Sequence, residues 1–302
     1  MTRAAIDIGT NSVRLLVRDG DRDLERVSVV TRLGAGVDKT GYLGRDAIER
    51  TLETLRDFVD VLGRHGNPPL RVAATSAARD AANCDELFGA VEKILGVAPE
   101  LLSGEDEARL SFAGAVAGLD PATGPFLVVD IGGGSTELAV GTKRAEEACS
   151  LDIGAVRLTE SELHHDPPQP EELVNAIGIV HDMVDDALRD HLPSAEDAPV
   201  LVGVGGTITT VAAVEIGLRD YDRARVHHFR LRRAAVEDVF RTLATEPLAD
   251  RIHNPGLQPE RADIIVGGCC VLVAIMRLLH ADELVVCDAD LLDALAAEPL
   301  PA

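Results

Sequence analysis

Positive charge is scarce in this chain of 302 residues. Its 29 lysine and arginine residues face 51 aspartate and glutamate residues, which gives a formal net charge of −22. A broad basic face for nucleic acid is therefore excluded, and any polyanionic ligand must be held by local groups. Long apolar runs are missing too. The longest, Ile264 to Met276, has thirteen residues, fewer than the roughly 20 that cross a bilayer, so it predicts a buried helix and no membrane association.

The chain also lacks the marks of secretion and of a cysteine-based metal site. The start, MTRAAIDIG, has no basic segment followed by an apolar stretch and a cleavage site. The cysteines form an odd set without a CxxC pair or a metal-ligand spacing. Both features predict a cytoplasmic protein with reduced thiols. The cysteines are Cys84, Cys149, Cys269, Cys270 and Cys287.

Two histidine pairs, His164-His165 and His227-His228, invite a metal interpretation. Adjacent residues on a strand point to opposite faces, so one site cannot easily use both members of a pair. We therefore expect all four histidines to be structural or surface residues.

Apolar periodicity alternates between short β-rich runs and longer helical stretches, which predicts an α/β protein. An antiparallel meander is expected at the N-terminus, over 4–8, 13–17 and 24–33. Apolar residues spaced by four and three predict an amphipathic helix over 44–65. The next expected elements are a buried strand over 70–75, a helical region over 76–95, a short extended segment over 99–102 and a helix over 104–118.

A glycine- and proline-rich stretch, GLDPATGP (118–125), is the best linker candidate. It places domain I at 1–122 and domain II at 123–302, with the last helix a candidate to pack back on domain I. Each domain then opens with a strand, a turn and a second strand. The turns, DIGTNS (7–12) and DIGGGST (130–136), lie 123 residues apart. This repeat predicts two related halves with a ligand between them.

Turns rich in Gly, Ser and Thr expose backbone N–H groups, which can bind phosphate oxygens. The aspartates that open the turns, Asp7 and Asp130, can hold a hydrated divalent ion against those phosphates. No GxxxxGK[ST] pattern occurs, but GVGGT (203–207) forms a third glycine turn after a strand. The turns thus predict a phosphate site of another kind than the P-loop.

Six stretches in order carry a closer resemblance. They are DIGTNSVRLLV (7–17), ATSAARDAAN (74–83), SGEDEARL (103–110), DIGGGSTEL (130–138), GAVRLTE (154–160) and GVGGTITTVAA (203–213). Together they resemble the exopolyphosphatase/guanosine pentaphosphate phosphohydrolase (Ppx/GppA) family over nearly the whole chain. The resemblance implies an α/β fold of two actin-like (ribonuclease H-like, ASKHA superfamily) domains facing each other across a cleft. It also implies metal-dependent hydrolysis of a terminal phosphoanhydride bond.

By this resemblance, Glu107 activates the attacking water and Arg79 pairs with phosphate oxygens. Asp130, Glu137 and Asp7 are the expected metal residues, with Mg²⁺ as the expected ion and Mn²⁺ as a possible substitute. The acidic run 105–107 also has a purely structural interpretation, because the helix dipole favours acids at a helix start. The expected phosphate-binding residues are Thr10, Asn11, Ser12, Gly132, Gly133, Gly134, Ser135, Thr136, Gly205, Gly206 and Thr207.

Longer family members carry an additional C-terminal helical domain, and this chain ends at Ala302. We therefore expect a short form, an exopolyphosphatase that prefers short polyphosphate chains. Hydrolysis of guanosine pentaphosphate is the nearest alternative, since no motif identifies a guanosine pocket. An actin-like kinase and a nucleotide-regulated scaffold are the alternatives from other classes. A homodimer is the expected assembly, because isologous dimers are the commonest.

Overall fold

The computed structural model describes residues 1–297. For Glu196 it describes the backbone alone. The chain divides into two compact units. Unit 1 comprises Met1–Leu110 and the segment from Leu291 onward, and unit 2 comprises Ser111–Asp290. The change from one unit to the other lies inside helix α5 (Gly104–Val116), twelve residues before the boundary expected at 122.

Unit 1 is built on one five-stranded sheet with the order β3-β2-β1-β4-β5. Strands β1, β2 and β3 form the expected antiparallel meander, and β4 and β5 continue the sheet in parallel with β1. Antiparallel neighbours need only a short turn, whereas the parallel strands are joined through helices. The strands are β1 (Thr2–Ile8), β2 (Ser12–Asp19), β3 (Arg22–Val30), β4 (Leu70–Ala74) and β5 (Glu100–Leu101).

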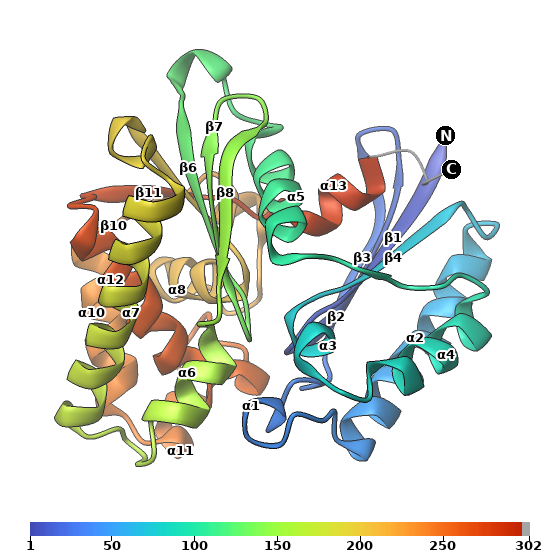
Figure 1. Ribbon diagram of the computed structural model, residues 1–302, viewed down its shortest axis with the longest axis horizontal. Helices are drawn as coiled ribbons and strands as arrows, with labels where there is room; N and C mark the ends of the chain where they lie inside the picture. The colour runs from blue at the N-terminus through green and yellow to red at the C-terminus, as the bar shows by residue number, and fades with distance from the viewer. Residues whose placement is uncertain (298–302) are drawn as a thin grey trace. The chain divides into compact units, whose positions relative to one another are not determined.

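Helices cover both faces of this sheet. Alternate residues of β1 divide between the faces, so Ile6 joins a cluster with Leu55 and Phe58 while Ala5 joins one with Leu295. The amphipathic helix α2 therefore packs on one face, and α13 packs on the other, where it lies beside β1 and β2 (Figure 1). The helices are α1 (Val37–Thr40), α2 (Arg45–Arg64), α3 (Ser76–Asp80), α4 (Cys84–Leu95) and α13 (Leu291–Ala297).

The single helical region expected over 76–95 is wrong, because the chain forms α3 and α4 with a break between them. The break is held by contacts with a distant segment. The side chain of Asn83 bonds to the backbone N–H and C=O of Leu43 at 2.8 and 3.1 Å, and the N–H of Ala82 donates to the carbonyl of Gly41 at 2.9 Å. These bonds replace the intrahelical bonds that a continuous helix would form.

Unit 2 contains a six-stranded sheet with the order β10-β11-β9-β6-β7-β8. Strands β6, β7 and β8 form a second antiparallel meander, β9 runs parallel to β6, and β11 runs parallel to β9. The strands are β6 (Phe126–Ile131), β7 (Thr136–Gly141), β8 (Ala145–Leu151), β9 (Val200–Val204), β10 (Arg230–Arg232) and β11 (Glu283–Val286).

The main core of unit 2 is centred on α12, whose residues from Ile265 to Met276 are all buried. The thirteen-residue apolar run is thus a buried helix, as the sequence predicts. Among the described residues, no helix combines the length and the apolar character needed to cross a membrane. The helices of the unit are α6 (Ala155–Glu162), α7 (Pro170–His191), α8 (Gly206–Ile216), α9 (Arg223–Val226), α10 (Arg233–Thr245), α11 (Leu248–Arg251) and α12 (Ile265–Leu278). Short 3₁₀ turns occupy Pro121–Thr123, Ala195–Asp197 and Pro259–Arg261.

The two sheets repeat one topology. Read from the meander outward, unit 1 has the order β3-β2-β1-β4-β5 and unit 2 has the corresponding order β8-β7-β6-β9-β11, with β10 added at the edge. The repeat of strand, turn and strand in the sequence therefore reflects a repeat of whole α/β units. This is the pair of actin-like units that the sequence predicts.

Candidate active site

The two aspartate-glycine turns have the same backbone geometry. In the first, the N–H of Gly9 donates to the carbonyl of Ser12 at 3.0 Å, and in the second the N–H of Gly132 donates to that of Ser135 at 3.0 Å. A Cβ on either glycine would lie 3.0 Å from that same carbonyl oxygen. Both turns therefore need glycine at this position for a close backbone approach.

The strands that enter and leave each turn place two side chains directly opposite each other. Asp7 pairs with Arg14 across β1 and β2, and Asp130 pairs with Glu137 across β6 and β7. Directly opposite residues project from the same face of a sheet. The repeat has thus placed an acid and a base in unit 1 where unit 2 has two acids.

In unit 1 the acid and the base form an ion pair. The guanidinium of Arg14 donates to Oδ2 of Asp7 from Nε at 2.9 Å and from Nη2 at 2.7 Å. Asp7 is buried, with 3% of its surface exposed. The positive charge that compensates Asp7 is therefore supplied by the protein itself.

In unit 2 each acid accepts a hydrogen bond from a serine hydroxyl. Ser111, on α5, donates to Oδ2 of Asp130, and Ser150, on β8, donates to Oε1 of Glu137 at 2.7 Å. Burial, assisted by the charge of Glu137, raises the pKa of the neighbouring Cys149 to about 11, so this thiol stays protonated. The donors here are oxygens only, which is the set that Mg²⁺ and other hard divalent ions prefer.

The third glycine turn lies against this pair of acids. Gly205 has a φ of +92°, and a Cβ there would lie 2.7 Å from Oδ1 of Asp130 and 2.7 Å from the carbonyl of Ile131. At Gly206 a Cβ would collide with the guanidinium of Arg261. The two glycines therefore keep space beside Asp130 that any side chain would fill, and an arginine borders that space.

The second turn is held in place from behind by the start of α6. The carbonyl of Gly132 accepts from the N–H of Ala155 at 3.0 Å, and that of Gly133 accepts from the N–H of Val156 at 2.8 Å. The guanidinium of Arg157 donates to the carbonyl of Gly134 at 2.9 Å. Because the carbonyls of the turn accept these hydrogen bonds, the conformation of its backbone is fixed by α6.

The three acids that open α5 have three different environments. Glu105 pairs with Arg109 one turn later at 2.6 Å and is exposed. Asp106 takes part in the helix cap, where its N–H donates to the Ser103 hydroxyl at 3.1 Å and its carboxylate accepts from it at 2.6 Å. Glu107 alone is buried, with 8% of its surface exposed. The helix dipole explains the first two acids, but not the burial of the third.

Arg79 holds the carboxylate of Glu107. Its Nη1 donates to Oε2 of Glu107 at 2.6 Å and to the carbonyl of Leu102 at 3.1 Å. The first turn is joined to the same helix, α3, because the N–H of Ala77 donates to the Thr10 hydroxyl at 3.2 Å. Unit 1 thus brings together Thr10, Arg79 and Glu107, near the ends of its parallel strands, where α/β sheets commonly bind ligands.

The first turn also carries an unsatisfied buried donor. Asn11 is 7% exposed, and its Nδ2 has no hydrogen-bond partner among the described residues. Buried side-chain donors are nearly always paired with protein, water or a ligand. Ser12, also buried at 8% exposed, is its neighbour in the turn. These side chains fit an anionic ligand at the turn.

Two predicted phosphate residues have side chains that pack against other parts of unit 2. Thr136 is fully buried, and its hydroxyl donates to the carbonyl of Ile153 at 2.7 Å. The side chain of Thr207 packs against Gly268 of α12. The hydroxyl of Thr136 therefore supports the fold. Ser135 is buried as well, at 2% exposed.

Sequence reasoning missed Ser111, Ser150 and Arg261. Ser150 lies opposite Glu137 in the register of β7 and β8, which would have been a usable signal once the second meander was aligned. Ser111 follows the SGEDEAR segment and belongs to the other unit. Arg261 lies in a 3₁₀ turn without any motif, and only the fold brings it to Gly206.

For His227-His228 the premise of a strand is wrong, so the argument that the two rings face opposite ways does not apply. The pair lies between α9 and β10 rather than within a strand, His228 has a φ of +64°, and the two rings stack with centroids 3.8 Å apart. Ligand atoms of both histidines and of Cys287 lie within 4.8 Å of one another. The other pair behaves as expected, since His165 is exposed and bonds to Glu172 at 2.8 Å.

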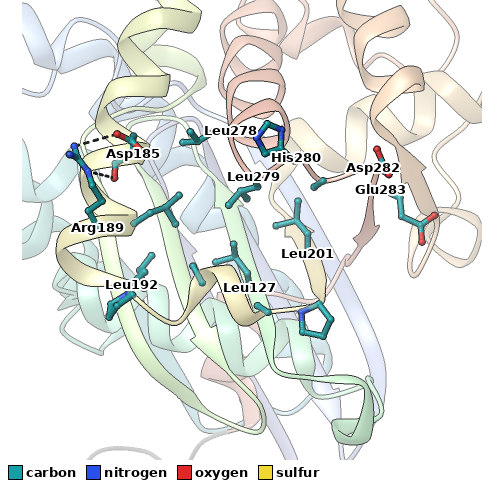
Figure 2. A pocket seen from close by; sticks show the side chains of 16 residues that line it. Leu127, Asp185, Arg189, Leu192, Leu201, Leu278, Leu279, His280, Asp282 and Glu283 are labelled. Atoms are coloured by element: carbon teal, nitrogen blue, oxygen red, sulfur yellow. Dashed lines mark hydrogen bonds and ion pairs between the residues drawn. The ribbon is translucent and has the colours of Figure 1, made fainter.

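A separate depression of about 920 Å³ lies in unit 2 between α7, α12 and the sheet. Figure 2 shows Leu127, Leu192, Leu201, Leu278 and Leu279 lining it. Its rim carries three acids, and its single arginine, Arg189, pairs with Asp185 at 3.3 Å. This apolar, acid-rimmed surface is unsuited to a polyphosphate anion.

Comparisons with known proteins identify the family. Residues 17–295 match the model of the Ppx/GppA phosphatase family. The chain is 40% identical over 310 residues to Exopolyphosphatase 2 of Mycobacterium tuberculosis, covering 97% of each chain. Its structure is similar to that of an exopolyphosphatase-like protein (TM-score 0.94, 36% identity, 98% and 97% covered). It is also similar to the Aquifex aeolicus Ppx/GppA family member (TM-score 0.81, 31% identity, 98% and 96% covered). The paired turns, the acids they position and these matches together show that the chain belongs to the Ppx/GppA phosphatase family.

Proposed function

We propose that this protein is an exopolyphosphatase that releases orthophosphate from the end of inorganic polyphosphate by Mg²⁺-assisted attack of water. Several relatives that cover nearly the whole chain are named exopolyphosphatases. The buried groups described above supply what such a reaction needs: a base for water, a cation site and fixed donors for phosphate oxygens.

The observation that carries the proposal is that the environment of Glu107 differs from that of its acidic neighbours. Glu105 and Asp106 are used by the helix itself, whereas Glu107 is buried and held by Arg79. Burying a carboxylate is unfavourable unless it is paired, and a helix start gains nothing from burying this one. We assign Glu107 as the base that accepts a proton from the attacking water, and Arg79 as the residue that orients it.

Asp130 and Glu137 are the residues that would hold the metal. Their oxygen donors, the serines that orient them and the space kept by Gly205 fit a hard divalent ion. When bound, Mg²⁺ would neutralise charge on the phosphoryl oxygens. Asp7 was expected to share this role, but its ion pair with Arg14 favours a role in ordering the first turn.

The glycine turns would bind phosphate through backbone N–H groups, at Gly132 to Ser135 and at Gly205 and Gly206. The side chains that add to them are those of Thr10, Asn11, Ser12 and Ser135. Thr136, whose hydroxyl bonds to Ile153, would contribute through the main chain only. Thr207 would contribute its backbone N–H. Arg261, beside Gly206, supplies a guanidinium that suits phosphate oxygens.

Short chains are the proposed substrates. With a net charge of −22, the surface repels each phosphate that extends beyond the local cations and turns. The terminal phosphates contact the turns and the local cations. Each additional phosphate is only repelled by the negative charge of the protein. Turnover per chain end should therefore not rise as the polymer is lengthened.

The test is orthophosphate release with Mg²⁺ from short polyphosphate, long polyphosphate, guanosine pentaphosphate and ATP, each with wild type and Glu107→Gln. We expect turnover of short polyphosphate that the substitution abolishes. Preferential release of orthophosphate from guanosine pentaphosphate would instead identify the protein as a guanosine pentaphosphate phosphohydrolase. Binding without hydrolysis by the wild type would favour a nucleotide-regulated scaffold or a kinase, and would contradict the role of Glu107.

A further inference from the structure

A cluster of nitrogen and sulfur ligands lies in unit 2, at the segment that follows β11. Cys287 comes directly after that strand, and His227 and His228 come directly after α9. One ligand atom from each of the three lies within 4.8 Å of the other two. The proposed polyphosphate chemistry uses none of these residues.

The backbone that carries the cluster is fixed by hydrogen bonds to the sheet. The N–H of His228 donates to the carbonyl of Val286 at 2.6 Å, and the N–H of Val286 donates to that of Phe229 at 2.9 Å. The N–H of Cys287 donates to the carbonyl of Gly203 on β9 at 2.8 Å. The ligand-bearing segments are thus held together by main-chain bonds, and only the side chains need to move for a metal to bind.

The sulfur and the nearer ring already have the spacing of metal ligands. Sγ of Cys287 lies 3.6 Å from Nδ1 of His227. Bond lengths to Zn²⁺ of about 2.0–2.1 Å for nitrogen and about 2.3 Å for sulfur place two tetrahedral ligands about 3.6 Å apart. Nδ1 of His227 accepts from the N–H of Asp288 at 3.1 Å, so it is the unprotonated nitrogen, and a metal bound there would replace this hydrogen bond. That is the form of imidazole that binds metals.

The third ligand is available from the solvent side. His228 is exposed and stacks on His227, with its ring also lying over Gly118, where no side chain intervenes. Rotation of this exposed ring can bring a nitrogen to the ion without disturbing the core. The residue is held at a φ of +64°, a backbone conformation uncommon for a residue other than glycine and a reason to look for a function.

We propose that His227, His228 and Cys287 bind one Zn²⁺ ion per chain, at a site separate from the all-oxygen pair Asp130 and Glu137. Two imidazoles and one thiolate form a donor set of the kind that selects Zn²⁺ over Mg²⁺, with water completing a tetrahedral shell. Binding breaks the S–H bond of Cys287, which now points to the carbonyl of Ala115 at 3.3 Å, and releases that proton to solvent.

The experiment is a titration of chelator-treated protein with Co²⁺, used as a spectroscopic substitute for Zn²⁺, in excess Mg²⁺. A Co²⁺–thiolate bond gives a charge-transfer band in the near ultraviolet, which carboxylate ligands do not give. We expect the band to saturate at one equivalent and to disappear when Zn²⁺ is added. Absence of the band in the wild type would overturn the proposal.

Variants assign the ligands. Cys287→Ser should abolish the band, and His228→Asn should weaken Co²⁺ binding at least about tenfold. The matched controls, Cys84→Ser and His181→Asn, should leave it unchanged, because neither residue belongs to the cluster. If Cys287→Ser does not fold, as judged by circular dichroism, the exposed His228→Asn variant decides alone. A band that keeps wild-type affinity in His228→Asn would refute the three-ligand site.

Discussion

Replacing Gly154 by alanine tests whether the second glycine turn positions the substrate. Gly154 is the N-cap of α6 and has an extended backbone, so alanine brings no conformational strain of its own. Its Cβ, however, would lie 2.5 Å from the carbonyl oxygen of Gly133 and 2.6 Å from the carbonyl carbon. Both atoms belong to the backbone of the turn, so no side chain can rotate away to relieve the contact.

The size of the effect follows from that distance. Ordinary contact begins at 3.4 Å, so turn and helix must separate by about 0.9 Å (3.4 − 2.5). A displacement of about 1 Å in a positioning group can cost roughly 100-fold in rate, which corresponds to about 2.7 kcal/mol in the barrier. Since both segments can share the shift, we expect kcat/KM to fall roughly 30- to 100-fold. The free energy of unfolding should fall by about 1–3 kcal/mol, as in other overpacked sites.

The assay is orthophosphate release from short polyphosphate, with chemical denaturation to confirm folding. Gly44→Ala is the matched control. It also places alanine at a helix N-cap, but a Cβ there meets nothing within 4 Å. We expect the control to retain wild-type kinetics. A folded Gly154→Ala variant with a kcat/KM within a few-fold of wild type would refute the role given to the turn.

Three further predictions concern metal binding, pH and stability. Ser111→Ala removes the hydroxyl donor to Asp130, the proposed metal residue. It should raise the Mg²⁺ concentration for half-maximal activity about 10- to 100-fold, measured by metal titration. The hydrogen bond from His165, with backbone donors, lowers the pKa of Glu172 from 4.5 to about 2, so its stabilising contribution is complete above 4.5 and lost as pH falls towards 2. The difference in thermal midpoint between wild type and Glu172→Ala should narrow over that window. Asp293→Ala removes the 2.5 Å partner of the Arg26 guanidinium, which keeps Asp23 at 3.0 Å. The free energy of unfolding, measured with denaturant, should fall by about 1–2 kcal/mol, less than for a fully buried pair, because Arg26 stays paired and is part-exposed.

Elements governed by local sequence were predictable. The meander and α2 follow from apolar spacing within each segment, and α12 follows from an unbroken apolar run. The break between α3 and α4 was not predictable in this way. Asn83 ends one helical segment by bonding to Leu43, forty residues away in sequence, and periodicity carries no record of such a contact.

In the candidate site, too, the features set by local sequence were predictable and those set by the fold were not. The glycine turns can be recognised in sequence because close backbone approach requires glycine, as at Gly205 with its positive φ. The partner of each acid is set by strand register, so the opposition of Asp7 to Arg14 and of Asp130 to Glu137 emerges only when the sheet is known. Arg261 reaches Gly206 through the fold alone.

The histidine pair shows a further limit. The rule that adjacent residues face opposite ways holds on a strand, and His227-His228 lies in a turn where a positive φ brings the rings together. Cys287, sixty residues later, completes the cluster. Rules based on the sequence spacing of metal ligands cannot identify residues that are so far apart in sequence and close only in the fold.

The most direct test of the account compares single-turnover phosphate release by Glu107→Gln with that by Glu105→Gln. The two acids lie two residues apart on α5, but only Glu107 is buried against Arg79. The account predicts that Glu107→Gln lowers the rate by about 10²- to 10⁴-fold, as expected for loss of a general base, while Glu105→Gln stays near wild type. Equal rates in the two folded variants would contradict the assignment of Glu107 as the base.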